Sequence, residues 1–131
     1  MFKRNMALTA LLSLSACVTA ATTGTPLADG NNVPLGRSAY VDGPIIRPVK
    51  IIEDSRCPMN ARCIWAGTVK IEAIWVRPGG DRSFELELGK PVPLADGSIE
   101  LTDVSPSRMA GEGRELKPAD YRFSFRFVGG I

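Results

Sequence analysis

Two cysteines carry the most informative chemistry in this chain. Cys57 and Cys63 enclose five residues, and Pro58 fixes the backbone φ angle directly after the first of them. A turn of that length brings two Cα atoms within the roughly 4.4–6.8 Å that a disulfide requires, and closing so short a ring stabilises a fold by about 2–2.5 kcal/mol. A redox pair would favour two intervening residues, and a structural zinc site needs four Cys or His ligands, whereas the chain has no histidine. The spacing therefore predicts a structural disulfide, provided that the domain is exported.

The lack of histidine also excludes Ser-His-Asp and Cys-His catalysis, and the chain has no glycine-rich phosphate loop. Carboxylates remain, with Glu85 and Glu87 on one face of an expected strand. A glycosidase needs two carboxyl groups roughly 5–10 Å apart across a cleft, one of them with a raised pKa. Alternating glutamates are more typical of a solvated strand face, so we expect no enzyme, no cofactor and no metal. Possible oxygen ligands for calcium occur at two other places: Glu53 with Asp54, and Asp96 with Ser98 and Glu100. Neither group has a recognised calcium-loop spacing.

The first sixteen residues have the layout of a signal peptide. Lys3 and Arg4 are followed by an uncharged, mostly apolar run over residues 7–16, which is too short to span a bilayer. The run ends in Leu14-Ser15-Ala16-Cys17, which resembles the lipobox of bacterial lipoproteins. The resemblance implies a diacylglyceryl group on the sulfur of Cys17 and cleavage before it; the alternative is an ordinary signal peptide that contains a cysteine. One cysteine for lipid and two for a bridge leave no odd thiol.

Cleavage before Cys17 would leave 115 of the 131 residues, enough for one domain with a real core. Two of the sixteen basic residues lie in the signal segment, so fourteen remain against fourteen acidic residues. A nearly neutral chain argues against a nucleic-acid partner, and it indicates that acyl chains provide any membrane attachment. Residues 18–33 show no period of 2 or 3.6, so we expect a lipidated cysteine and flexible tether over 17–33, with a reach of about 20 Å, and one domain over 34–131.

Apolar residues alternate through most of that domain, and turn signals recur at short intervals. We expect strands over 35–41, 45–53, 68–77, 83–88, 98–104 and 121–127, with an edge or a bulge near Pro48. The last strand is the clearest, because it places Tyr121, Phe123, Phe125 and Phe127 on one face. The segment ending at Tyr121 resembles the tyrosine corner of immunoglobulin-like and fibronectin-type sandwiches. The sequence therefore predicts an all-β, small antiparallel β-sandwich of that kind, with a small β-barrel as the second choice.

The loop that holds the two cysteines resembles the shared signature of a family of small bacterial lipoproteins and secreted proteins. That signature is an Asp-Ser-Arg-Cys-Pro run followed, after a few variable residues, by Cys, Trp and Gly. The matching positions here are Asp54, Ser55, Arg56, Cys57, Pro58, Cys63, Trp65 and Gly67. The resemblance implies a kind of protein and carries no activity over to this chain.

The loop residues allow a structural and a functional interpretation. In the first, Asp54 and Ser55 bond turn amides, Arg56 forks onto a neighbouring carboxylate or loop carbonyls, Trp65 covers the disulfide, and Gly67 lets the chain re-enter the sheet. In the second, the loop is a contact patch for a partner, because a pre-ordered loop loses little entropy on docking, and Met and Arg are enriched at interfaces. The candidate contact residues are Arg56, Pro58, Met59, Asn60, Arg62 and Trp65.

These observations predict a lipid-anchored bacterial envelope protein that binds an envelope partner without catalysis, as an assembly component or an inhibitor-like module. Val18, rather than Asp, follows the lipidated cysteine, which by the lipoprotein resemblance implies the outer membrane in a Gram-negative host. Two alternatives stay open. One is a structural envelope protein with no discrete ligand, and the other is a carboxylate enzyme or a calcium-dependent module.

Overall fold

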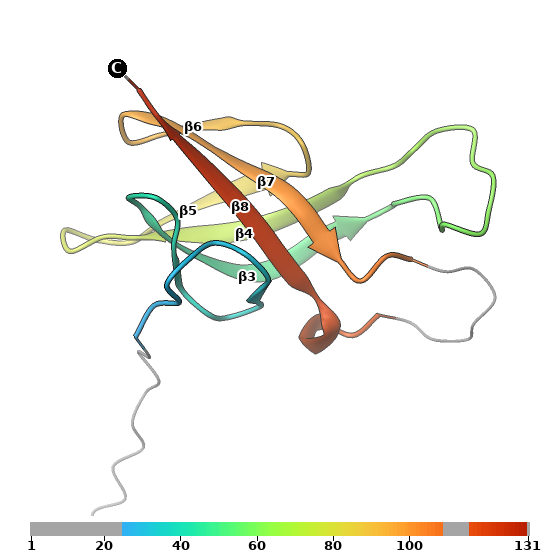
Figure 1. Cartoon of the computed structure of the whole chain (residues 1–131), viewed down its shortest axis with the longest axis horizontal. Coiled ribbons are helices and arrows are strands. Elements are labelled where there is room, and N and C mark those ends of the chain that lie inside the picture. The colour runs from blue at the N-terminus through green and yellow to red at the C-terminus, as the bar shows by residue number, and fades with distance from the viewer. Residues whose placement is uncertain (1–24, 109–115, 131) are drawn as a thin grey trace, which may run out of the picture.

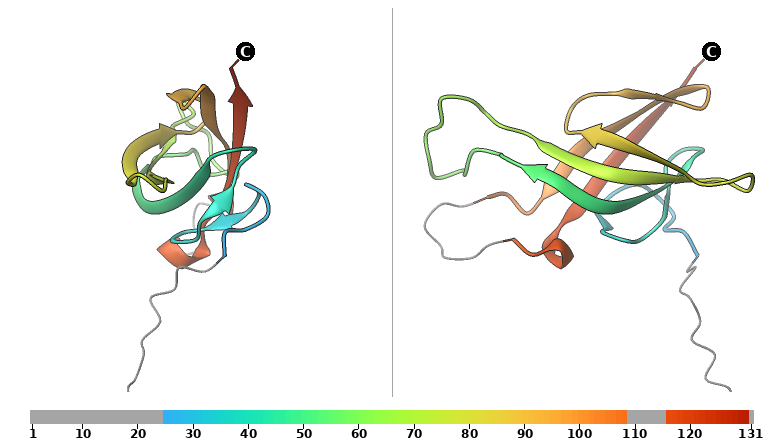
Figure 2. Two further views of the ribbon diagram at one scale, coloured as in Figure 1. Left: turned by 90° about the vertical axis from the view of Figure 1, so that its left-hand side faces the viewer. Right: turned by 180° about the vertical axis from the view of Figure 1, so that it is seen from behind.

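The computed structural model describes residues 25–108 and 116–130, which form two four-stranded antiparallel sheets packed face to face (Figures 1 and 2). The strand orders are β2-β3-β4-β5 and β1-β8-β7-β6. The predicted small β-sandwich is confirmed, and the sheets do not close into the barrel that was the second choice. The elements are β1 Val33–Pro34, β2 Ala39–Tyr40, β3 Ile45–Asp54, β4 Val69–Val76, β5 Arg82–Glu87, β6 Val92–Leu94, β7 Gly97–Ser105, the 3-10 helix η1 Pro118–Asp120, and β8 Arg122–Gly129.

The order of the strands within each sheet follows the chain more closely than in an immunoglobulin domain. β2 to β5 are consecutive in one sheet, and β6 to β8 are consecutive in the other, where β1 is added beside β8. Immunoglobulin domains instead interleave their strands through Greek-key connections. The sandwich architecture is therefore as predicted, whereas the strand order is that of two meanders.

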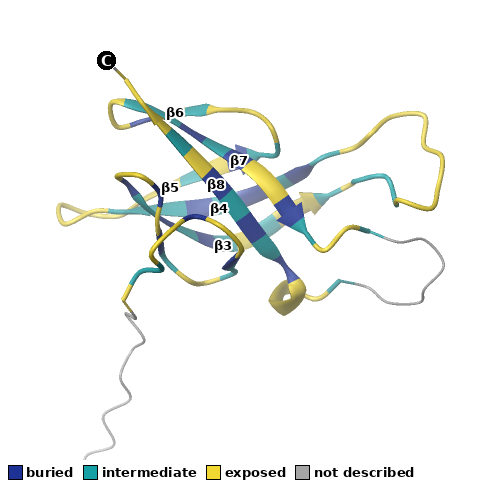
Figure 3. Cartoon of the chain, viewed as in Figure 1, coloured by how far each residue is buried: buried dark blue, intermediate teal, exposed yellow. Residues whose placement is uncertain are grey.

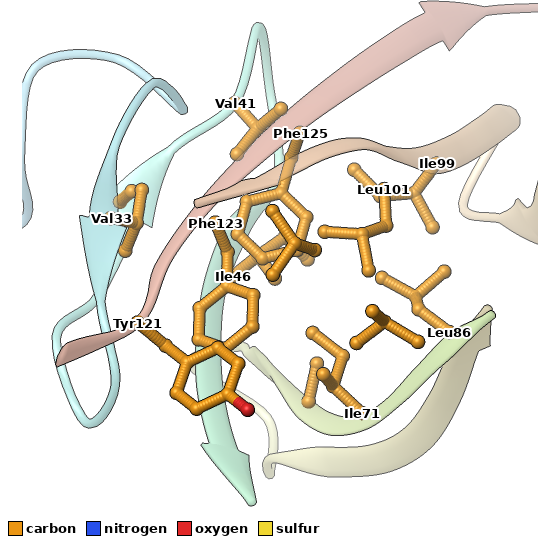
Figure 4. Close-up of a cluster of buried hydrophobic side chains, with 14 of the residues drawn as sticks. Val33, Val41, Ile46, Ile71, Leu86, Ile99, Leu101, Tyr121, Phe123 and Phe125 are labelled. Atoms are coloured by element: carbon orange, nitrogen blue, oxygen red, sulfur yellow. The ribbon is translucent and has the colours of Figure 1, made fainter. Parts of the chain in front are cut away.

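Strands of both sheets contribute to the core, and β4 and β8 show its pattern most clearly, because their side chains alternate between the two sides of the strand. Val69, Ile71 and Ala73 are fully buried, and so is Phe123, with its neighbours at positions 121 and 125 almost so (Figures 3 and 4). Both inward faces agree with the predicted ones. Trp75 ends the inward row of β4 and is only partly buried, as Phe127 is at the end of the row on β8.

β3 is the longest strand and is bent near its middle. Its register against β4 shifts between Pro48 and Lys50, as expected for a proline that cannot donate to the ladder. The predicted bulge near Pro48 is thus confirmed. β4 and β5 form a hairpin around residues 77–81, and it projects at one end of the sandwich (Figure 2).

The domain begins earlier than the predicted boundary at residue 34. Leu27 exchanges backbone hydrogen bonds with Ser38 and Tyr40 at 2.9 Å, and the Gly30 carbonyl accepts one from the Phe125 amide at 2.8 Å. The chain then forms β1, whose Val33 is fully buried. A tether reaching residue 33 is therefore wrong: residues 27–33 lack a local apolar period because they pair with residues 38–40 and with β8, which lies far away in the sequence. The single strand expected over 35–41 is also wrong, since a turn separates β1 from β2.

Candidate functional site: the bridged loop

The bridged loop, residues 55–67, connects β3 to β4 and projects at one end of the molecule (Figure 1). The predicted disulfide between Cys57 and Cys63 is present, with the two Cα atoms 5.9 Å apart. The Cys57 amide also donates to the Ala66 carbonyl at 3.0 Å. The loop is therefore closed both by a covalent bond and by the backbone.

The base of the loop is clasped by a side chain and tightened by a glycine. The Ser55 hydroxyl donates to the Thr68 carbonyl at 3.2 Å and accepts from the Thr68 amide at 3.0 Å. Gly67 has a φ of +68°, and a Cβ atom there would lie 1.7 Å from the Ser55 carbonyl oxygen. Only glycine both adopts that backbone conformation readily and allows this close approach. The predicted role of Gly67 in returning the chain to the sheet is confirmed.

A guanidinium fork fastens the loop to the opposite sheet. Arg56 donates from Nε and Nη2 to the two carboxylate oxygens of Asp54, both at 2.9 Å. Its Nη1 donates to the Val104 carbonyl of β7 at 2.8 Å. The side chains of Arg56 and Asp54 are only 14% and 9% exposed, so this bidentate pair is shielded from solvent, where such pairs are strongest. It joins the end of β3 to the other layer of the sandwich.

Two further side chains complete this network. The Tyr121 hydroxyl donates to Oδ2 of Asp54 at 2.8 Å. Arg108 donates from Nη1 to the carbonyls of Asp54 and Arg56, both at 3.1 Å, and its own carbonyl accepts the Met59 amide at 2.9 Å. The expected tyrosine corner is therefore wrong, because Tyr121 bonds a carboxylate 67 positions away instead of nearby backbone. We refer to Asp54, Arg56, Arg108 and Tyr121 as the clamp.

The clamp shifts the protonation of its members. Burial alone would raise the pKa of Asp54, but the hydrogen bonds from Arg56 and Tyr121 and the charge of Arg56 outweigh it, so the pKa falls below 3.8. The hydrogen bond to Asp54 raises the pKa of Arg56. Burial, with the hydrogen bond to Asp54, raises the pKa of Tyr121 to about 12. The charged pair and the neutral phenol are thus the stable forms at neutral pH.

The tip of the bridged loop presents large apolar side chains to solvent. Ile64 is 93% exposed, Trp65 75% and Met59 74%, and no other large hydrophobic residue among those described exceeds 55%. Trp65 therefore does not cover the disulfide, contrary to the structural interpretation. Among the other candidate contact residues, Asn60 and Arg62 are exposed and Pro58 is partly buried. Arg56 was also a candidate contact, but it faces Asp54, so its role is the structural one.

Two of the carboxylates considered above are engaged by neighbouring donors. Glu87 lies 3.2 Å from Nζ of Lys90, whose hydrogen bond lowers the pKa of this carboxyl group, whereas a general acid needs a raised one. Asp54 is occupied by its clamp partners. Within residues 25–108 and 116–130, no three acidic or cysteine side chains are grouped to hold a metal ion. None of the helices in those ranges is long and apolar enough to cross a membrane.

Sequence reasoning missed two residues of this site. Ile64 was not among the candidate contacts, although its place between Cys63 and Trp65 in a turn-rich loop was the available signal. Arg108 gave no signal at all, because its role depends on a contact between chain segments about fifty residues apart. Cys17, the predicted lipidation site, lies outside the described residues.

Comparison with known protein families, with curated proteins and with solved structures finds no match to this chain. The resemblance of the loop to small bacterial lipoproteins and secreted proteins therefore stays a prediction that rests on the eight loop residues given above.

Proposed function

We propose that this chain is a lipid-anchored protein of the bacterial cell envelope that binds a partner protein, without catalysis, through the tip of the bridged loop. The observation that carries the proposal is the exposure of Met59, Ile64 and Trp65 on a loop that is fixed by the disulfide and the clamp. Large apolar side chains clustered on a soluble surface are typical of interaction sites. The disulfide and the clamp hold the loop in place before a partner arrives, which reduces the entropy lost on binding.

The N-terminal sequence supports the envelope location. The signal-peptide layout of residues 1–16 and the lipobox-like run ending in Cys17 both favour export and lipidation. A structural disulfide is also typical of proteins that fold in an oxidising compartment. By the family resemblance, the residue after Cys17 favours the outer membrane of a Gram-negative host.

The place of the loop relative to the anchor supports a partner that approaches from the far side. Leu27 pairs with Ala39 of β2, which in turn pairs with Ile46 near the start of β3, whereas the bridged loop follows the end of β3 (Figure 1). The ten residues of β3 span about 33 Å at ~3.3 Å each. The ten residues from Cys17 to Leu27 would, as a loose coil, reach only about 18 Å. A tether of that reach favours an arrangement in which the loop tip lies on the side of the domain away from the membrane.

A photo-crosslinking residue placed at position 64 tests the contact in intact envelopes. We expect one discrete adduct from position 64 and none from position 128, where Val128 is 55% exposed but lies on β8. Ile64→Ser with Trp65→Ser should reproduce the envelope phenotype of cells that lack the protein. Tyr40→Ser with Val128→Ser, which also removes exposed apolar area, should not. Both pairs should leave stability within about 0.5 kcal/mol of the wild type.

Equal adducts from both positions, or a loop pair that leaves the cells like the wild type, would favour the purely structural envelope protein instead.

The anchor is tested separately. Intact mass of the native protein should show acyl groups on a chain that begins at Cys17, and Cys17→Ala should remove them. An unmodified N-terminus elsewhere would contradict the anchor and leave the contact proposal standing.

A further inference from the structure

A groove opens at the end of the sandwich opposite the bridged loop. It lies among the turn after β2, the base of the β4–β5 hairpin, the β6–β7 turn and the end of β8, and has a volume of about 790 Å³. That volume falls within the range typical of small-molecule sites. None of the residues in the loop or in the clamp lines it.

Aromatic and aliphatic side chains line the groove because the inward rows of both sheets end there. Trp75 is the last inward residue of β4 and Phe127 that of β8, and both remain partly exposed where the layers separate. Ile45, at the start of β3, adds to the same lining. A Cβ atom on Gly43 would still lie 3.8 Å from the ring of Phe127, so this edge of the ring is not crowded.

Two carboxylates give the groove its charge. Asp42 and Asp96 both line it, and within the part of the chain that the structure describes neither carboxylate has a hydrogen-bond or ion-pair partner. Arg77 is the one basic side chain in the lining, and it is already engaged. Its guanidinium carbon lies 4.5 Å from the centre of the Trp75 ring, and its Nε donates to the Gly80 carbonyl at 3.1 Å. The groove therefore carries a net negative charge and an aromatic ring that already holds a cation.

The backbone at the rim is strained. Only three non-glycine residues in the described ranges have a positive φ, and two of them, Asp42 at +49° and Ala95 at +52°, line the groove. Ala95 is the first residue of a two-residue hairpin turn, a position at which a positive φ usually requires glycine. Strain of this kind persists where the surrounding structure holds it, and it is concentrated at functional sites.

We propose that this groove binds an organic cation on an apolar stem, with Asp42 and Asp96 holding the charge while Trp75 and Phe127 pack against the stem. An alkylammonium or guanidinium group fits the two free carboxylates, and three to five methylene groups fit the aromatic lining. The same chemistry is offered by a free amine and by a lysine or arginine side chain of an extended peptide. The site is separate from the bridged loop, so either proposal can fail without the other.

The chain allows a direct optical test, because it contains two tryptophans. In full-length protein carrying Trp65→Phe, in non-ionic detergent, Trp75 is the single reporter of the groove. The probes are n-hexylamine and the blocked peptide acetyl-Ala-Lys-Ala-amide, each compared with its neutral counterpart, hexanol or the norleucine peptide. We expect both cations to change Trp75 fluorescence on binding, with dissociation constants at least tenfold lower than those of their neutral counterparts. Added salt should weaken the binding of the cations. The tighter of the two cations identifies the source of the ligand.

Three variants test whether each charged group strengthens or weakens binding of the cations. Asp42→Asn with Asp96→Asn should weaken the cations about tenfold or more, and asparagine tolerates the positive φ at position 42. The matched control, Glu53→Gln with Glu85→Gln, removes the same charge outside the groove and should stay within about twofold, since charges beyond a screening length contribute little. Arg77→Leu should tighten the cations about threefold or more, because it removes a like charge and uncovers the Trp75 ring.

Three results would overturn the proposal: no Trp75 response below about 10 mM of either cation, neutral probes that bind as well as the cations, or an Arg77→Leu variant that binds more weakly. The last result would mean that Arg77 helps to shape the groove and does not compete with the ligand for the Trp75 ring. Urea midpoints that are unchanged from the wild type will show that the variants are folded.

Discussion

Replacing Arg56 by methionine should destabilise the domain by about 3 kcal/mol, because it breaks the clamp and leaves a shielded carboxylate behind. The side chain makes three hydrogen bonds of 2.8–2.9 Å, two of them to the charged Asp54. Removing one partner of a buried ion pair costs about 3–5 kcal/mol, and the 14% exposure of Arg56 places this case at the lower end. Methionine has a similar length, so packing changes little.

Urea unfolding followed by circular dichroism measures the effect. With a slope of about 1.5 kcal/mol per molar urea, the midpoint should fall by about 2 M while the slope stays unchanged. The matched control is Arg126→Met, which breaks an ion pair with Glu100 at 2.6 Å whose arginine is 62% exposed. An exposed pair of this kind contributes about 1 kcal/mol or less.

A double-mutant cycle separates the pair from its surroundings. Asp54→Asn alone should also destabilise, but Asp54→Asn with Arg56→Met should cost less than the two single changes together, by about 1–3 kcal/mol. If Arg56→Met costs no more than Arg126→Met, or if the two single costs simply add, the clamp does not hold the loop and the reasoning fails.

Three other predictions concern the loop and its surroundings. Cys57→Ala should lower the free energy of unfolding by about 2–2.5 kcal/mol, and reductant should do the same to the wild type; free thiols in non-reducing peptide maps would contradict it. Gly67→Ala should cost more than about 2 kcal/mol, because its Cβ atom would meet backbone, whereas Gly79→Ala, which meets nothing within 4 Å, should cost about 0.5 kcal/mol or less in the same urea assay. The pKa of Tyr121 is raised to about 12, so the stability that it contributes is fully present below pH ~10 and is lost between about pH 10 and 12. Tyr121→Phe should flatten that part of the pH profile, and an unchanged profile would count against the bond to Asp54.

The parts of the fold that depend on local pattern were predictable from the sequence. The alternation of Phe123 and Phe125 with polar neighbours placed the inward face of β8 correctly, because burial of one strand face imposes a period of two. Pro48 placed the bulge in β3, because proline has no amide to donate. The spacing of Cys57 and Cys63 was enough for the disulfide.

The parts that depend on distant contacts were not predictable. Val33 is buried only because it pairs with β8, ninety residues further on, so the segment before it looks like a tether. For Arg56 the sequence left open a fork onto a neighbouring carboxylate and a contact with a partner, whereas its bond to the carbonyl of Val104 in the other sheet had no sequence signal. The groove is built from four separate segments, none of which has a local signature of a ligand site.

The edges of the two sheets affect how copies of this protein would associate if the proposed anchor holds them on one membrane. The outer strands are β1, β2, β5 and β6, and the first two have only two residues each. Pro34 and Pro93 remove an amide donor from β1 and β6, while β5 presents the exposed charges of Arg82 and Glu85. Short, proline-bearing or charged edges resist pairing with the edge of another sheet. If the proposed anchor crowds copies side by side on a bilayer, these edges would disfavour joining of their sheets.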